Sequence, residues 1–171
     1  MLNVEQLTTD LITYCVARAP AILATVQGKY GSSIPLPAIQ RDRYFIGEPS
    51  RFRAYETPCA FVVTERTRRT SEANVHDFKL HSLLLSILVE DKDEQRLTRS
   101  CWRYAEAYDA VLHHPELVDV NVAGRTWSAQ SDVTGIDYGV MFVRDPNDRV
   151  FRKDIALELT IKHWDLLTPM G

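Results

Sequence analysis

The chain has 171 residues, of which 45% are hydrophobic and 25% are charged, and its formal net charge at pH 7 is -3. This length and composition are those of an ordinary globular protein, so we expect one domain over residues 1–171 rather than a disordered chain. The negative charge disfavours a dedicated nucleic-acid-binding protein, because such proteins are usually basic. No uninterrupted apolar run reaches the roughly 18 residues of a membrane span, and the N-terminus lacks a signal-peptide pattern, so we expect synthesis in a cytoplasm and no membrane association.

The residue types that carry chemistry are scattered. Cys15, Cys59 and Cys101 are widely spaced without a CxxC pair, which indicates buried core thiols. The 5 histidines have no HExxH pattern or cysteine neighbours, so they do not predict a metal site. The chain also lacks GxSxG, P-loop and GxGxxG motifs. We therefore expect no catalytic residue, no cofactor and no metal ion, and so no enzyme.

The N-terminal segment predicts a helix. Asn3 and Gln6 resemble a capping box, and an apolar stripe predicts a helix over residues 4–18 that ends before Pro20. The next segment, 19–28, fits either a short helix or a strand.

Residues 28–58 have little periodicity and are interrupted by glycines and prolines, so they predict a long irregular arm or insertion. Residues 43–47 form the one short strand expected in it. The arm fits either a solvated surface loop or a segment that orders against a neighbouring subunit. It contains four arginines that we treat as candidate interface residues: Arg41, Arg43, Arg51 and Arg53.

Two apolar segments predict a long antiparallel hairpin. Residues 59–65 form its first strand, and residues 79–90 form a strand with leucines on both faces, which belongs inside a sheet. We expect the charged tip between them to hold Arg66, Arg68 and Arg69. These arginines are either solvated or part of an interface, because a hairpin that extends past its sheet has unpaired edges.

A second helix follows this central strand. Asp91 and Glu94 resemble a capping box, and Pro115 is expected to end the helix. Trp102 lies off the apolar stripe, at the flank of the core or at an interface. The stripe itself consists of Leu97, Cys101, Tyr104, Ala105, Tyr108, Val111 and Leu112.

The remaining chain predicts about three strands: 118–127, 139–143 and 155–161, with a turn at 144–149. The order of elements predicts an α+β fold. We expect a single mostly antiparallel β-sheet with two helices packed on one face, plus the long irregular arm and extended β-hairpins.

Three passages resemble the tail terminator (tail-completion) proteins of long-tailed bacteriophages. They are residues 57–63, a proline followed by a short apolar strand; residues 81–117, a strand leading into a helix that ends at a proline; and residues 135–139 leading to the strand 151–159. Together they cover somewhat more than half of the chain. The arm at 28–58 departs from the resemblance, because it is longer than expected for this family.

The resemblance implies a structural virion protein. Such proteins form a ring, expected to be a hexamer, that caps the finished tail tube and joins it to the head–neck connector, with DNA passing through without specific binding. The implied partners are other copies of the chain, the tail tube protein, a neck or connector protein and, where the tail is contractile, a sheath protein. The implied location is the tail–neck junction of the virion, after assembly in the bacterial host cytoplasm. Asp145 and Asn147 join the arginines as candidate interface residues.

Two other readings remain open. Another neck component, such as a head–tail connector or stopper, would share the location but have different partners. A small-molecule-binding α+β domain would need a pocket with converging polar groups, and the sequence indicates none.

Overall fold

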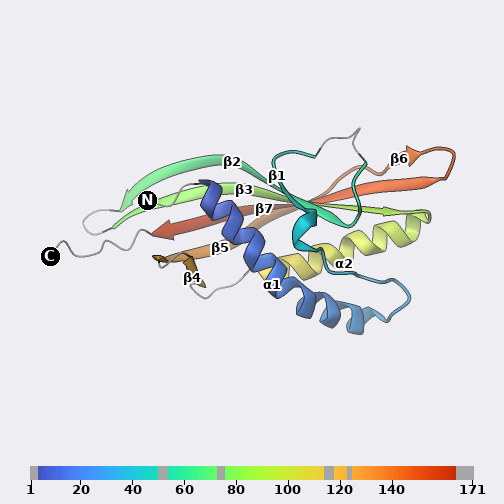
Figure 1. The fold of residues 1–171 in the computed structure, drawn as a ribbon, viewed down its shortest axis with the longest axis horizontal. Coiled ribbons are helices and arrows are strands. Elements are labelled where there is room, and N and C mark those ends of the chain that lie inside the picture. Colours follow the sequence, from blue (N-terminus) through green and yellow to red (C-terminus); the bar gives the residue numbers. More distant parts are fainter. Residues whose placement is uncertain (1–3, 50–53, 73–75, 114–117, 123–124, 165–171) are drawn as a thin grey trace.

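A computed structural model describes residues 4–49, 54–72, 76–113, 118–122 and 125–164 of the chain. They form an α+β fold with two helices and one sheet (Figure 1). In chain order the elements are α1 (Val4–Tyr30), a 3-10 turn η1 (Arg41–Arg43), β1 (Tyr44–Ile46), β2 (Cys59–Glu72), β3 (His76–Asp91), α2 (Glu94–Leu112), β4 (Val118–Val122), β5 (Arg125–Tyr138), β6 (Phe142–Asp145) and β7 (Val150–Trp164).

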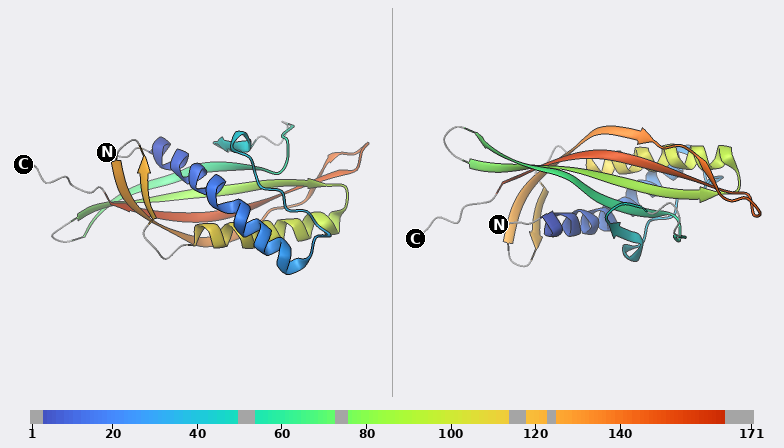
Figure 2. Two further views of the ribbon diagram at one scale, coloured as in Figure 1. Left: turned by 60° about the horizontal axis from the view of Figure 1, so that its bottom comes forward. Right: turned by 90° about the horizontal axis from the view of Figure 1, so that it is seen from above.

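The sheet has the strand order β1-β2-β3-β7-β5-β4, and β6 also pairs with β7. Only β1 and β2 run parallel; the other pairs are antiparallel. This confirms the expected mostly antiparallel sheet. The last strand, β7, lies in the middle, between β3 and β5, and the long strands are strongly twisted (Figure 2).

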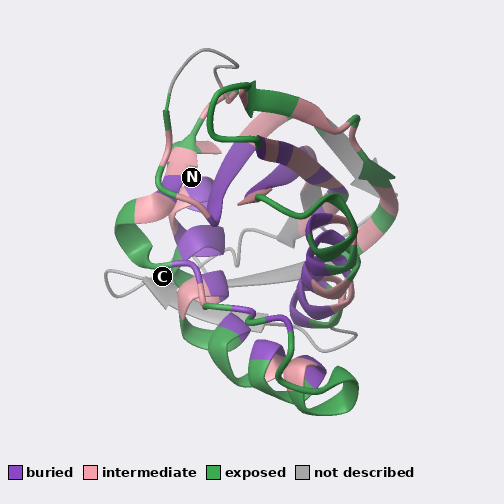
Figure 3. Ribbon diagram, turned by 90° about the vertical axis from the view of Figure 1, so that its right-hand side faces the viewer, coloured by how far each residue is buried: buried purple, intermediate pink, exposed green. Residues whose placement is uncertain are grey.

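One face of the sheet packs against both helices. Alternate residues of β3 and β7 are buried there, including Leu85 and its cross-strand partner Leu157. The stripe of α2 and the buried residues of α1 belong to the same hydrophobic cluster, as Figure 3 shows by the buried positions gathered where helices and sheet meet. The predicted core faces of β3, β7 and α2 are therefore confirmed.

Helix α1 is longer than predicted. The sequence indicated an end before Pro20, but the helix continues to Tyr30 with Pro20 inside it. The buried stripe crosses the proline, since Cys15 and Ala19 precede it and Leu23 follows it on the same side. Packing of that stripe outweighs the helix-breaking tendency of one exposed proline. The segment 19–28 is thus helical.

Helix α1 is also long and apolar enough, by length and composition, to cross a membrane, with a mean hydropathy of 1.2. The sequence analysis did not anticipate this. The same criterion is met by core helices of soluble proteins. Leu7, Ile12 and Leu23 of α1 are buried in the cluster that includes α2 and the sheet, so one side of this helix packs on the rest of the chain.

The first half of the arm packs against its own chain. Ile34, Leu36 and Ile39 are buried, and Leu36 and Ile39 belong to the main hydrophobic cluster. The Leu36 amide donates to Gln27 Oε1 at 3.3 Å, and the predicted short strand is present as β1. The reading as a fully solvated loop is therefore wrong for this half, because these apolar side chains are buried within the same chain, and the reading as a segment that contacts a neighbouring subunit stays a prediction. Residues 50–53 lie outside the described residues.

Helix α2 begins two residues later than its predicted capping box. The N-cap is Asp93, whose carboxylate accepts the Arg96 amide at 2.8 Å. Asp91 instead accepts two hydrogen bonds from the Arg96 guanidinium, at 2.6 and 2.7 Å. The helix ends at Leu112, before the predicted stop at Pro115, which lies outside the described residues.

The C-terminal strands differ from the prediction in number and position. Residues 118–127 were expected to form one strand, but β4 ends at Val122 and β5 begins at Arg125, and the two pair as a hairpin. Strand β6 begins at Phe142 rather than at Gly139. The Gly139 amide donates to the Asp154 carbonyl at 3.0 Å, and a Cβ at Gly139 would lie 2.1 Å from Asp154 Oδ1. The space beside Asp154 therefore suits only a glycine, and the hydrogen bond extends the contact of this segment with β7 by one residue beyond β5.

Candidate functional site

The arginines expected at the hairpin tip lie inside β2 instead. Arg66, Arg68 and Arg69 are paired with Ser82, Leu80 and Lys79 of β3, and β2 continues to Glu72. The prediction that these arginines lie at the tip was wrong, because the polar residues 66–72 continue the antiparallel pairing of β2 with β3. Arg66 and Arg68 are exposed, and the side chain of Arg69 lies outside the described part.

Both long edges of the sheet are open over much of their length, among the strands that the structure describes. On one side β1 pairs only with residues 60–62 of β2, so β2 has no outer neighbour from residue 63 onward. On the other side β4 pairs only with residues 125–129 of β5, so β5 is open from residue 130 to residue 138. Open edges present unpaired N–H and C=O groups, which favour pairing with another chain.

The arginines of the arm are dispersed. Arg43 is half-buried and forms an ion pair with Glu56, so its charge is used within the chain. Arg41 is exposed in η1, and Arg51 and Arg53 lie outside the described residues.

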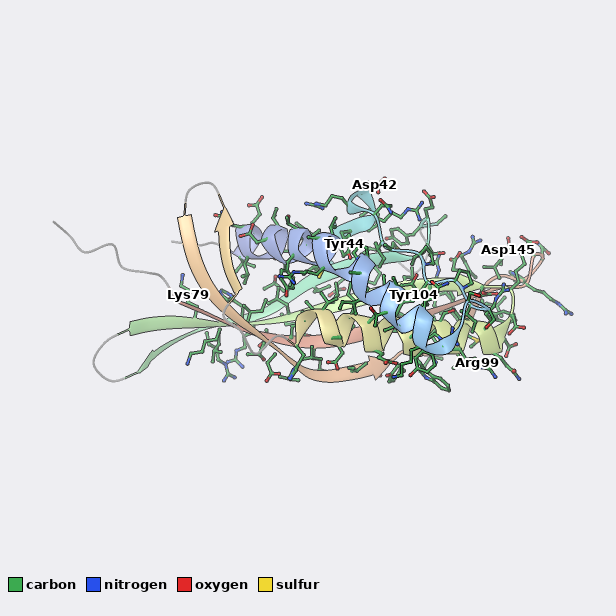
Figure 4. The ribbon with its side chains drawn as sticks, turned by 90° about the horizontal axis from the view of Figure 1, so that it is seen from below. Asp42, Tyr44, Lys79, Arg99, Tyr104 and Asp145 are labelled. Atoms are coloured by element: carbon green, nitrogen blue, oxygen red, sulfur yellow. The ribbon has the colours of Figure 1, made fainter. Side chains whose placement is uncertain are left out.

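The β6–β7 hairpin contains the last two candidate interface residues. Asp145 Oδ1 accepts the amides of Asn147 and Asp148, at 3.0 and 3.3 Å, so this carboxylate organises the turn. Asn147 is exposed. Figure 4 shows Asp145 at one end of the long axis and Lys79 of β3 toward the other. The candidate residues therefore lie at opposite ends of the molecule rather than in one site.

An open groove of about 710 Å³ lies between this hairpin and the start of α2. It is lined by Lys92, Asp93, Glu94, Gln95, Val143, Pro146, Arg149 and Phe151. Two of its charged groups already have structural partners: Asp93 caps α2, and Lys92 Nζ contacts Asp148 Oδ1 at 3.0 Å. We therefore interpret the groove as the place where the β6–β7 hairpin packs beside the start of α2, and not as a binding site. Among the described residues, no group of histidines, cysteines and acids could hold a metal ion.

A buried ion cluster was missed by the sequence analysis. Arg152 is 1% exposed, and its Nε donates to Glu90 Oε1 at 2.6 Å. Arg144 Nε lies 2.9 Å from the same oxygen. The cluster ties β3, β6 and β7 together on the face away from the helices. The sequence alone carries little signal for it, because Arg152 is followed by Lys153 and Asp154, and only the pairing of β3 with β7 sets it opposite Glu90.

Comparisons with known proteins complete these observations. No protein-family model and no curated protein matches the chain. Among solved structures, the chain is similar to one chain of a structure described as "Virion of native gene transfer agent (GTA) particle". The identity is 11%, the match covers 85% of this chain and 92% of that chain, and the TM-score is 0.30. At this TM-score the likeness carries no argument for a fold or a function.

Proposed function

We propose that this chain is a structural protein of a phage-like virion, and more specifically a tail terminator whose copies form a ring on the end of the tail tube. The sequence resemblance is the source of this proposal. One structural observation supports it most: the sheet is open along both long edges and ends in hairpins that point in opposite directions along the long axis (Figure 1). A ring needs contacts with two neighbours and two further faces for other partners.

The two hairpins suit contacts above and below such a ring. The β2–β3 hairpin and the β6–β7 hairpin lie at opposite ends of the molecule (Figure 2). In the proposed role, one end docks on the tail tube protein and the other on the neck or connector, while six copies close the ring. A sheath protein would be a further partner in a contractile tail. DNA passes through the ring, and a net charge of -3 opposes adhesion of its phosphates.

Exposed apolar side chains are compatible with an assembling protein. Trp102 of α2 is 55% exposed, and Val140, between β5 and β6, is 85% exposed. Aromatic residues are enriched at protein interfaces, and single exposed apolar residues are otherwise common. The charged groups of the groove at α2 stabilise a helix end and a turn, so we propose an assembly role rather than catalysis.

Deletion of the gene from its parent particle tests the proposal. A missing terminator leaves tails of uncontrolled length that do not join filled heads, as seen by negative-stain electron microscopy. Tails of normal length beside unattached heads would instead favour a connector or stopper. Normal particles would contradict any role in the neck. Light scattering of the purified chain adds a separate criterion, since a dimer that is independent of concentration and never binds tails would favour the small-molecule-binding reading.

A further inference from the structure

The two open edges of the sheet carry opposite charges on the same face. Arg66 and Arg68 are exposed on β2, and Asp132 and Asp137 are exposed on β5. The pairing of the strands sets Arg66 opposite Ser82, Ser82 opposite Thr160, and Thr160 opposite Asp132. Arg66 and Asp132 thus end one cross-strand row, on the face away from the helices.

The strand directions allow another copy to continue this sheet. From edge to edge the strands are β2, β3, β7 and β5, and each neighbouring pair is antiparallel. With four alternating strands, β2 runs opposite to β5. A copy placed beside the first in the same orientation therefore sets its β2 antiparallel to the open edge of β5, so the alternation is preserved across the contact.

Apolar side chains flank the charged positions at matching ends of the two edges. Ile46 of β1 is 62% exposed and pairs with Val62, near the start of the open part of β2. Tyr138 at the end of β5 is 43% exposed. The row of Tyr138 leads through Ile155 and Ile87 to the β2 residue Ala60, which is next to the first open residues of β2. Ala60 is already paired with Tyr44 of β1, so these apolar residues mark the end of the open part of the edge and leave the contact to the charged row.

We propose that a second copy of this chain adds edge to edge to the sheet, with residues 63–68 of its β2 antiparallel to residues 130–135 of β5, so that Arg66 faces Asp132 and Arg68 lies diagonally from the same carboxylate. The inference rests on the proposed ring-forming function and names its subunit contact. Such a contact uses two different surfaces, so it is heterologous and generates a ring if the rotation closes. Main-chain hydrogen bonds between the two edge strands would hold the contact together. The opposite charges on the two edges would favour pairing of β2 with β5 over pairing of two like-charged edges.

Two local features fit this arrangement. Each open edge contains one irregularity, between Thr64 and Arg66 on β2 and between Val133 and Gly135 on β5. Bulges increase twist and curvature, which a sheet that closes around an axis requires. Asp132 also contacts His113 at 3.2 Å, with both side chains about 60% exposed. An exposed pair of this kind is weak and does not prevent Asp132 from meeting an arginine.

A charge-swap experiment on the full chain tests the contact by sedimentation velocity over a concentration series. The wild type is expected to self-associate. The variants R66E/R68E and D132K, each with two like-charged edges, are expected to associate at least about tenfold more weakly. An equimolar mixture of the two variants is expected to recover association, because each then meets an edge of opposite charge.

The matched control is R99E/R149E, which reverses two exposed charges away from both edges and should assemble like the wild type. Circular dichroism must show equal folding of all variants, since every reversed residue is exposed. A wild type that remains monomeric throughout, association unchanged in both edge variants, or a folded mixture without recovery would overturn the proposal. Rings that persist in the edge variants would refute this subunit contact but not the terminator role. Recovery of association in the mixture, together with normal tails in the deletion strain, would refute the terminator role but not the contact.

Discussion

The hydroxyl oxygens of Tyr44 and Tyr108 lie 2.6 Å apart in the protein interior, where one hydroxyl donates to the other. The contact joins β1, within the arm, to the C-terminal half of α2. A second hydroxyl of the same helix, that of Tyr104, donates to the Pro37 carbonyl at 2.7 Å. Helix α2 therefore holds the arm through hydrogen bonds as well as through apolar packing.

The substitution Tyr108→Phe tests the first of these contacts. It leaves the buried Tyr44 hydroxyl without this partner, and we expect the free energy of unfolding to fall by about 1–3 kcal/mol. The double variant Y44F/Y108F should lose less than the sum of the single variants, because neither hydroxyl is then left unsatisfied. Urea unfolding of the four proteins measures both effects. A change below about 0.5 kcal/mol in Tyr108→Phe would contradict the structural role of the pair.

The buried tyrosines and thiols predict alkaline destabilisation. Burial raises the pKa of Tyr108 and of Tyr44 above the ordinary value of 10.0. Burial also raises the pKa of Cys15 from 9.0 to about 12. Above pH 9.0 the unfolded chain therefore loses protons that the folded chain keeps, so the stability is full below the unfolded-state values and falls as the pH rises. Urea midpoints measured from neutral to alkaline pH should decline first near the thiol value and more steeply above the tyrosine value, and Tyr108→Phe should reduce the steeper decline.

The buried ion cluster predicts a large effect at Glu90. Glu90→Ala removes the carboxylate that Arg152 and Arg144 share, and Arg152 is fully enclosed. We expect a loss of about 3–5 kcal/mol, because the buried guanidinium of Arg152 loses the carboxylate that it contacts through Nε and Nη2. Lys92→Ala is the control, since the Lys92–Asp148 pair is 64% exposed on both sides and should cost less than about 1 kcal/mol. Similar losses in the two variants would show that burial does not decide the strength of these pairs.

Pro20 offers a stabilising substitution. It lies exposed inside α1 and has no N–H for the hydrogen bond to the carbonyl four residues earlier. Pro20→Ala should raise the free energy of unfolding by about 1–3 kcal/mol, as measured by thermal and urea unfolding. Ala21→Gly, one residue further at another exposed position, is the control and should lower it by about 0.5–1 kcal/mol. A loss of stability in Pro20→Ala would mean that the proline supports the path of the helix.

The elements with strong periodicity were predictable from the sequence. The stripe of α2 and the alternation of β3 and β7 follow directly from side-chain spacing, so their core faces were assigned correctly. The errors occur where tertiary contacts outweigh local preference. Helix α1 continues past Pro20 because its apolar side packs on the core. Strand β2 continues through its polar second half because its backbone pairs with β3. The sequence identified Arg66 and Arg68 as candidate interface residues, but not the open acidic edge of β5, because its significance depends on which strands lack neighbours.

The position of β7 has a consequence for how the chain can be synthesised. Strand β7 leaves the ribosome after β3 and β5, yet it lies between them in the sheet. Until β7 emerges, the β2–β3 hairpin and the β4–β5 hairpin are not joined in one sheet. The apolar strand β3 then lacks the partner strand that pairs with it in the folded protein. Transiently exposed strands of this kind are prone to aggregation. A nascent chain stopped anywhere before residue 150 is thus a substrate for chaperones or proteases rather than a shorter version of the same protein.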